Sequence, residues 1–258
     1  MTLLAVGHGT RDPAGVAVIR ALLDRVRALR PGLTVIESYA EITAPSLEDA
    51  LTVFPAVPGP VVASPVVASP VVAGPAVAGP VVAVPLMLGR GYHALIDIPG
   101  RVGPDVAVAG PLGPHPLLAG ALVDRLGTGR YADAVVLGAA GTSSPEGLAD
   151  AASAAHLLGR RLRRPVAYGL AAGAGPDLTE VVRGLRAQGA RRIAVASYLL
   201  APGHFHDRLA AAGADVVAPP LGVHDALARV VLRRYDEAMA AVAAEARSRD
   251  RRAVSRAG

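Results

Sequence analysis

The chain has 258 residues, 52% of them hydrophobic, a formal net charge of +5 and no cysteine. This length suits one large domain or two ordinary ones, and the lack of cysteine excludes disulfides, thiolate metal sites and cysteine-bound iron–sulfur clusters. Residues 247–258 hold five arginines and one aspartate, so the rest of the chain is too close to neutral for a nucleic-acid-binding surface. We expect this end to be solvated and frayed, with a polyanion-binding arm as the alternative.

Strand and helix patterns alternate along the chain. Asp12-Pro13 is typical of a helix N-terminus, and the helical spacing that follows it ends at Pro31-Gly32. Ser46 is a typical cap for a second helix, and another helix is expected from His115. Predicted strands lie at 3–7, 33–39, 81–88 and 106–110, then at 134–138, 165–171, 192–200 and 215–220. Strands separated by helices predict parallel sheets that are covered on both faces.

Residues 60–85 form an apolar tract that is long enough to cross a bilayer. Proline recurs at every fifth position, and each proline fixes φ and removes a backbone donor, so no helix can run through the tract. We interpret residues 61–80 as a Pro-Val-Val-Ala unit expanded in tandem, with an extended or polyproline-like conformation. Because the insert lies between a helix and a strand, we expect it at the sheet edge opposite the strands' carboxyl ends.

The chain contains an internal duplication. VGHGTRDPAG (6–15) is echoed by GAAGTSSPEG (138–147), and VPLMLGRGYH (84–93) is echoed by ASYLLAPGHF (196–205). In each half, the two segments begin at the end of a predicted strand. The two halves therefore share one plan.

Sequence spacing ties the insert to the duplication. His8 and His93 are 85 positions apart, and their counterparts Ala140 and Phe205 are 65 apart. The difference equals four of the five-residue units, so removing these units brings the two halves into register. One count thus supports both the duplication and the insert.

We therefore predict an α/β protein of two doubly wound domains with parallel sheets, related by internal duplication. Residues 1–128 form the first domain, which carries the insert, and residues 132–240 form the second. An Arg-rich tail follows at 241–258. The two domains should pack as an internal pseudo-dimer within a monomer. No signal peptide precedes the first strand, so we expect a cytoplasmic protein.

Three polar residues follow neighbouring strands of the first half: His8, Glu41 and His93. Ligands bind beyond the carboxyl ends of the strands in such sheets, so these side chains should meet at one edge. Two imidazoles and a carboxylate suit a first-row divalent metal ion, and the carboxylate can also accept protons. The second half lacks all three residues, which predicts a single site; the aligned positions are Ala140, Ala172 and Phe205.

Other interpretations apply to the same residues. His8 alone would more often complete the hydrogen bonding of a tight turn, and Glu41 would more often be an ordinary exposed carboxylate. The glycines around His8 do not complete a dinucleotide-binding motif, because Asp12 stands where its third glycine should fall. A histidine phosphatase would need arginine, not Gly7, before the histidine.

Of the five other histidines in the chain, four stand in recognisable patterns. His115 and His224 occur in both halves at a helix start, which favours a structural role at the helix terminus. His204 and His206 form an H-x-H in the second half. We expect them on the surface or at the rim of a cleft, with a second metal site or a share in the main site as alternatives.

Three segments together resemble the class II chelatases: VGHGTRDPAG, PSLEDAL with Glu41 ahead of it, and PLMLGRGYHALIDIP. The similarity covers both halves, roughly residues 3–237, and is closer to the two-domain sirohydrochlorin chelatases. These enzymes insert Co²⁺ or Fe²⁺ on the way to cobalamin or sirohaem. The resemblance implies a cleft for a small-molecule tetrapyrrole, a divalent metal ion as substrate, no permanently bound cofactor, and no nucleic-acid or membrane partner.

The same resemblance implies roles for individual residues. His8 and His93 would bind the metal ion, and His8 would also accept a proton, as would Glu41. Arg11 and Arg90 would clamp carboxylates of the macrocycle, although each arginine is also an ordinary choice for a solvated surface. The macrocycle would be lined by Leu88, Gly89, Arg90, Gly91 and Tyr92. The alternatives are a metal- or tetrapyrrole-binding carrier without turnover on the same fold, or a paralogue that has lost activity.

Overall fold

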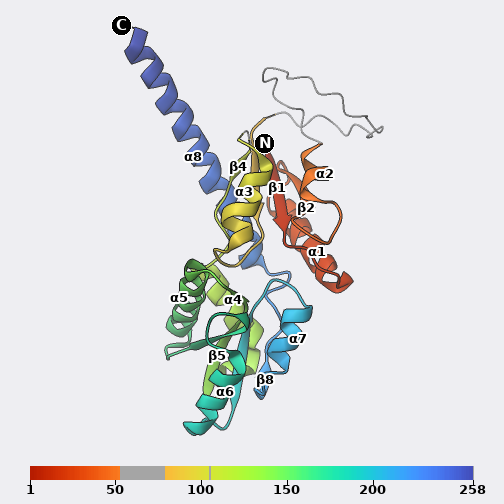
Figure 1. Ribbon diagram of the computed structural model, residues 1–258, viewed down its shortest axis with the longest axis vertical. Helices are drawn as coiled ribbons and strands as arrows, with labels where there is room; N and C mark the ends of the chain where they lie inside the picture. Colours follow the sequence, from red (N-terminus) through yellow and green to blue (C-terminus); the bar gives the residue numbers. More distant parts are fainter. Residues whose placement is uncertain (53–78, 105, 258) are drawn as a thin grey trace.

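A computed structural model describes residues 1–52, 79–104 and 106–257 of the chain (Figure 1). It contains two four-stranded parallel sheets with the same strand order, β2-β1-β3-β4 and β6-β5-β7-β8. Helices cover both sheets, so the prediction of two doubly wound α/β units is confirmed. The predicted conformation of the insert at 61–80 lies outside the described residues, apart from Gly79 and Pro80.

The first sheet consists of β1 (Thr2–Gly7), β2 (Thr34–Tyr39), β3 (Val81–Pro85) and β4 (Ala107–Val108). The helical segments of this half of the sequence are α1 (Pro13–Leu29), α2 (Leu47–Leu51), the π-helical turn η1 (His93–Asp97), α3 (Ile98–Val102) and α4 (Pro116–Leu126). The third strand is shorter than predicted. Leu86 donates its backbone N–H to the Val6 carbonyl, and beyond this bond β1 has ended, so the chain turns away as a loop.

The second sheet consists of β5 (Ala134–Thr142), β6 (Ala167–Gly173), β7 (Ile193–Tyr198) and β8 (Val216–Val217). Its helical segments are the 3₁₀ turn η2 (Gly127–Tyr131), α5 (Pro145–Leu162), α6 (Leu178–Ala187), α7 (His204–Ala210) and α8 (Asp225–Ala257). Pairing of β5 with β6 and β7 matches the pairing of β1 with β2 and β3. The duplication seen in the sequence is therefore also a duplication of topology.

Helix caps lie where the sequence places them. Asp12 accepts from the N–H of Ala14, and Ser46 forms a capping box with Asp49. His115 Nδ1 accepts the N–H of Leu117, as His224 Nδ1 accepts that of Ala226. The predicted structural role of these two histidines at helix termini is confirmed.

The two halves exchange their last helices, which the sequence did not predict. Helix α4 follows β4, yet it packs against α5 and β7 of the second half. Helix α8 ends the second half, yet it packs against α1, β3 and β4 of the first (Figure 1). One hydrophobic core therefore runs through both halves, from Leu3 and Val82 to Val135 and Ala194.

The C-terminal segment differs from the prediction. Helix α8 continues to Ala257 and projects beyond the first sheet, whereas we expected an Arg-rich tail at 241–258 with a frayed end from residue 247 (Figure 1). The alanines and arginines of this segment are good helix formers, so the helix propagates past its last packed turn. Within the described residues, no helix combines the length and apolarity that crossing a bilayer requires.

Candidate functional site

The turn after β1 places His8 beside Glu41. Gly9 has φ +103°, and a Cβ on it would lie 1.8 Å from the carbonyl oxygen of Glu41. The ladder between β1 and β2 extends into this turn, since Ala40 N–H donates to Gly7 O at 2.8 Å and Glu41 N–H donates to His8 O at 3.0 Å. Only glycine fits between the two chains, so the G-H-G order holds the histidine next to the carboxylate.

The second half repeats this turn without the functional side chains. Gly141 has φ +131°, and a Cβ on it would lie 2.0 Å from the carbonyl oxygen of Ala172. Ala172 therefore occupies the place of Glu41, and Ala140, just before Gly141, occupies the place of His8. The backbone of the turn is preserved in the second half, while its imidazole and carboxylate are replaced by methyl groups.

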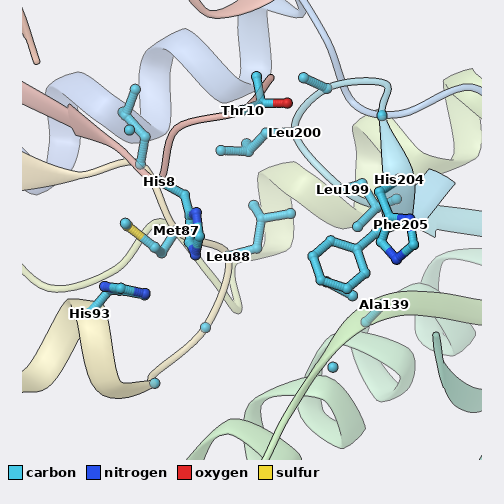
Figure 2. Close-up of a pocket in the computed structure, with 18 of the residues that line it drawn as sticks. His8, Thr10, Met87, Leu88, His93, Ala139, Leu199, Leu200, His204 and Phe205 are labelled. Atoms are coloured by element: carbon cyan, nitrogen blue, oxygen red, sulfur yellow. The ribbon is translucent and has the colours of Figure 1, made fainter. Parts of the chain in front are cut away.

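His93 comes to the same edge from the third strand. It begins η1, and its ring lies edge-on to that of His8, with ring centroids 4.5 Å apart and planes at 78° (Figure 2). His93 Nε2 is 3.7 Å from Glu41 Oε1. One ligand atom from each of His8, Glu41 and His93 lies within 4.8 Å of the others, the one such cluster in the described part of the chain. The structure thus brings together the three residues that the sequence placed at one edge.

Asp97 orients the ring of His93. Its Oδ2 is 3.0 Å from His93 Nδ1 and 3.2 Å from Arg101 Nη1. A carboxylate paired with arginine can only accept, so Nδ1 of His93 carries the proton and Nε2 presents a lone pair towards His8 and Glu41. Arg101 is itself held by both oxygens of Glu48, at 2.8 Å each. This is the arrangement that fixes the tautomer of a metal-binding histidine.

Asp97 lies in the segment PLMLGRGYHALIDIP, but its role was not predicted from the sequence. The usable signal was its spacing, because a residue four positions after His93 on a helical turn lies on the same face. Asp150 and Tyr198 were also missed. They belong to the second half and reach the loop before His93 from 60 and 110 positions away in sequence, respectively, and no local pattern marks such contacts.

His8 and His93 lie on one wall of a cleft of about 1150 Å³ between the two halves, and Glu41 stands beside them without lining it. The opposite wall belongs to the second half and includes Ala139, Leu199 and Phe205 (Figure 2). His204 and His206 also line this cleft, in keeping with the predicted rim position. The residues expected to contact a macrocycle all line it as well: Arg11, Leu88, Gly89, Arg90, Gly91 and Tyr92.

The two arginines of the cleft differ in their surroundings. Arg11 is exposed and makes no ion pair with any described residue. The guanidinium of Arg90 instead contacts Asp150, with Nη2 2.8 Å from Oδ1 and Nε 3.1 Å from Oδ2. Asp150 is only 4% exposed, so it compensates the charge of Arg90 from inside the second half.

Comparisons with known proteins agree with this geometry. The CbiX family profile matches residues 2–128 and 134–238, once in each half. No curated protein matches the chain by sequence. Among solved structures, "SirB from Bacillus subtilis with Fe3+" is similar with a TM-score of 0.69 and 22% identity, over 92% of this chain and 94% of that one. The sirohydrochlorin chelatase SirB from Bacillus subtilis subspecies spizizenii in complex with cobalt is similar with a TM-score of 0.67 and 20% identity, over the same shares.

Proposed function

Since the chain belongs to the CbiX family of class II chelatases, we propose that it inserts Co²⁺ or Fe²⁺ into sirohydrochlorin. The observation that carries this proposal is the meeting of His8, Glu41 and His93 within 4.8 Å, with the two histidines lining a cleft. Its volume of about 1150 Å³ is at the upper end for small-molecule sites, as a tetrapyrrole requires.

Neutral imidazole is a ligand for both cobalt and ferrous iron, so His8 and His93 are the proposed ligands of the incoming ion. Two protein nitrogens leave most coordination positions of the ion open, and the macrocycle nitrogens can replace its remaining waters one by one. The solved relatives carry the names of structures with Fe³⁺ and with cobalt, which supports the choice of metal.

Insertion exchanges two protons for one divalent ion. Two N–H bonds of the macrocycle break, four metal–nitrogen bonds replace the ion's bonds to water and protein with no change in oxidation state, and the two protons need acceptors beside the metal. Glu41 lies 3.7 Å from His93 Nε2 and its side chain is 50% exposed, so it can take a proton and return it to water. His8 is also exposed at the cleft and is the second proposed acceptor.

The cleft walls suit a flat ring with acidic substituents. The loop from Leu88 to Tyr92 forms one side, and Phe205 lies across the cleft, with 41% of its surface exposed. Arg11 is free to pair with a substrate carboxylate. Arg90 is less suited to this role, because Asp150 already holds its guanidinium.

Single-turnover absorbance tests the proposal. The purified protein is mixed with sirohydrochlorin and Co²⁺ or Fe²⁺, and metallation is compared with the uncatalysed rate and with the His8→Ala and His204→Ala variants. We expect acceleration that His8→Ala abolishes and that His204→Ala, across the cleft, leaves nearly intact. Tight binding without acceleration would favour a carrier. A loss in His204→Ala as large as in His8→Ala would refute the assignment of the site to the first half.

A further inference from the structure

The second half holds the loop that precedes His93. Tyr198 donates its hydroxyl to Leu88 O at 2.9 Å, and the Asp150 carboxylate accepts the backbone N–H of Arg90 at 2.7 Å. Ser144 Oγ donates to the carbonyl of Arg90 at 3.3 Å. The donors and the acceptor come from three places in the second half: the end of β7, the second turn of α5 and the cap of α5. The backbone of segment 88–90 is therefore hydrogen-bonded to the second half through the N–H group of Arg90 and the carbonyl groups of Leu88 and Arg90.

The contact is tight as well as polar. A Cβ on Gly147 of α5 would lie 2.6 Å from the carbonyl oxygen of Arg90, and a Cβ on Gly89 would lie 3.4 Å from Cβ of Asp150. Glycine at position 147 is required for this approach, whereas a Cβ at position 89 would make an ordinary contact. Burial raises the pKa of Tyr198 well above its usual value, so its hydroxyl stays protonated and continues to donate to Leu88.

Burying a carboxylate costs free energy unless it is hydrogen-bonded, and the described side-chain hydrogen bonds of Asp150 all go to the loop. It accepts from the backbone N–H, Nε and Nη2 of Arg90. The Arg90 side chain is 44% exposed, so its outer edge faces the cleft while its donors point at Asp150. Arg90 therefore anchors the loop to Asp150, and its guanidinium donors point away from a ligand in the cleft.

The group of His8, Glu41 and His93 is held in place without contacts from the second half. His93 is oriented by Asp97 and Arg101, and Glu41 is fixed to the His8 turn by backbone bonds, all within the first half. No described residue of the second half hydrogen-bonds to these side chains. Weakening the contacts of Asp150 should therefore move the loop while His8, Glu41 and His93 stay in place.

We propose that Asp150 and Tyr198 are positioning residues that fix segment 88–90 as a wall for the macrocycle, so that the half without metal ligands sets where the tetrapyrrole lies. This inference rests on the proposed function. It also assigns Arg90 to the loop anchor, in place of the carboxylate clamp expected from the sequence. The function of the second half is then to align the macrocycle with an ion bound by the first half.

Asp150→Asn distinguishes a loop anchor from a substrate clamp at Arg90, because the two roles predict opposite changes in the KM for sirohydrochlorin. Loss of the anchor should raise the KM for sirohydrochlorin about tenfold, the usual effect of losing a charge-assisted hydrogen bond, with kcat and the Co²⁺ absorbance titration within about twofold of wild type. If Arg90 is a substrate clamp, releasing it from Asp150 should lower KM. An unchanged or lower KM, or a loss of Co²⁺ binding, overturns the proposal.

Glu146→Gln is the matched control, since Glu146 is exposed on the same helix and makes no ion pair with the described residues. A KM increase equal to that of Asp150→Asn would show a general charge effect and also overturn the proposal. If Asp150→Asn does not fold, Tyr198→Phe decides the question, because it removes only the hydroxyl that binds Leu88 O. We expect a KM increase of a few fold in this variant, and no change refutes the anchor.

The dissociation constant of sirohydrochlorin, followed by absorbance without metal, separates this inference from the proposed function. Wild-type protein that binds the macrocycle without inserting metal would end the proposed function alone. The anchor would still predict weaker binding in Asp150→Asn and Tyr198→Phe. Wild-type insertion with unaltered binding in both variants would end the inference alone.

Discussion

Replacing Asp97 with alanine should weaken Co²⁺ binding by roughly 10- to 100-fold, because the histidine loses the group that fixes its tautomer. The carboxylate oxygen lies 3.0 Å from His93 Nδ1. A hydrogen bond to a charged group contributes about 1.5–3 kcal/mol, and about 1.4 kcal/mol corresponds to a tenfold change in affinity. The side chains are 22% and 17% exposed, so solvent screening places the expected loss nearer tenfold.

Asp97→Asn should lose less, since its amide oxygen still accepts from Nδ1 but carries no charge. Co²⁺ titration followed by visible absorbance measures the dissociation constant, and sirohydrochlorin metallation should slow in parallel. Asp24→Ala is the matched control, because Asp24 forms only an exposed ion pair with Arg27 on α1. A dissociation constant for Asp97→Ala within twofold of wild type, in a protein with an unchanged thermal midpoint, would refute the tautomer argument.

Two further predictions concern stability. Gly9→Ala should lower the thermal midpoint and abolish insertion, because the new methyl group would meet the Glu41 carbonyl at 1.8 Å, whereas Gly32→Ala has open space and should change neither; equal midpoints would contradict this. Burial, followed by nearby arginines, lowers the pKa of His115, whose neutral Nδ1 caps α4 through Leu117 N–H. Its contribution to stability is therefore present above the unfolded-state pKa and is lost as pH falls through the lower folded-state pKa. Urea unfolding should show a smaller loss of stability on acidification for His115→Asn, which caps without titrating, and an equal loss in both proteins would contradict the argument.

The site could be predicted as far as its residues follow strands. His8, Glu41 and His93 follow three neighbouring parallel strands, and parallel strands end at a common edge, so topology places them at the same edge of the sheet. The group that orients His93 could not be predicted in the same way. Assigning Asp97 to Nδ1 requires the ring orientation, which depends on how η1 packs beside Arg101.

Local order along the chain determined the strands, the helix caps, the repeat and its register, because hydrophobic periodicity and capping act over a few residues. Only the tertiary structure decided which sheet each terminal helix covers and how the second half contacts the first. Helices α4 and α8 each pack against the half that precedes or follows their own in sequence, and this choice lies in contacts between distant segments. The bond between Arg90 and Asp150 likewise joins residues 60 positions apart, and its strength comes from a burial that no single segment of the chain possesses before the halves pack together.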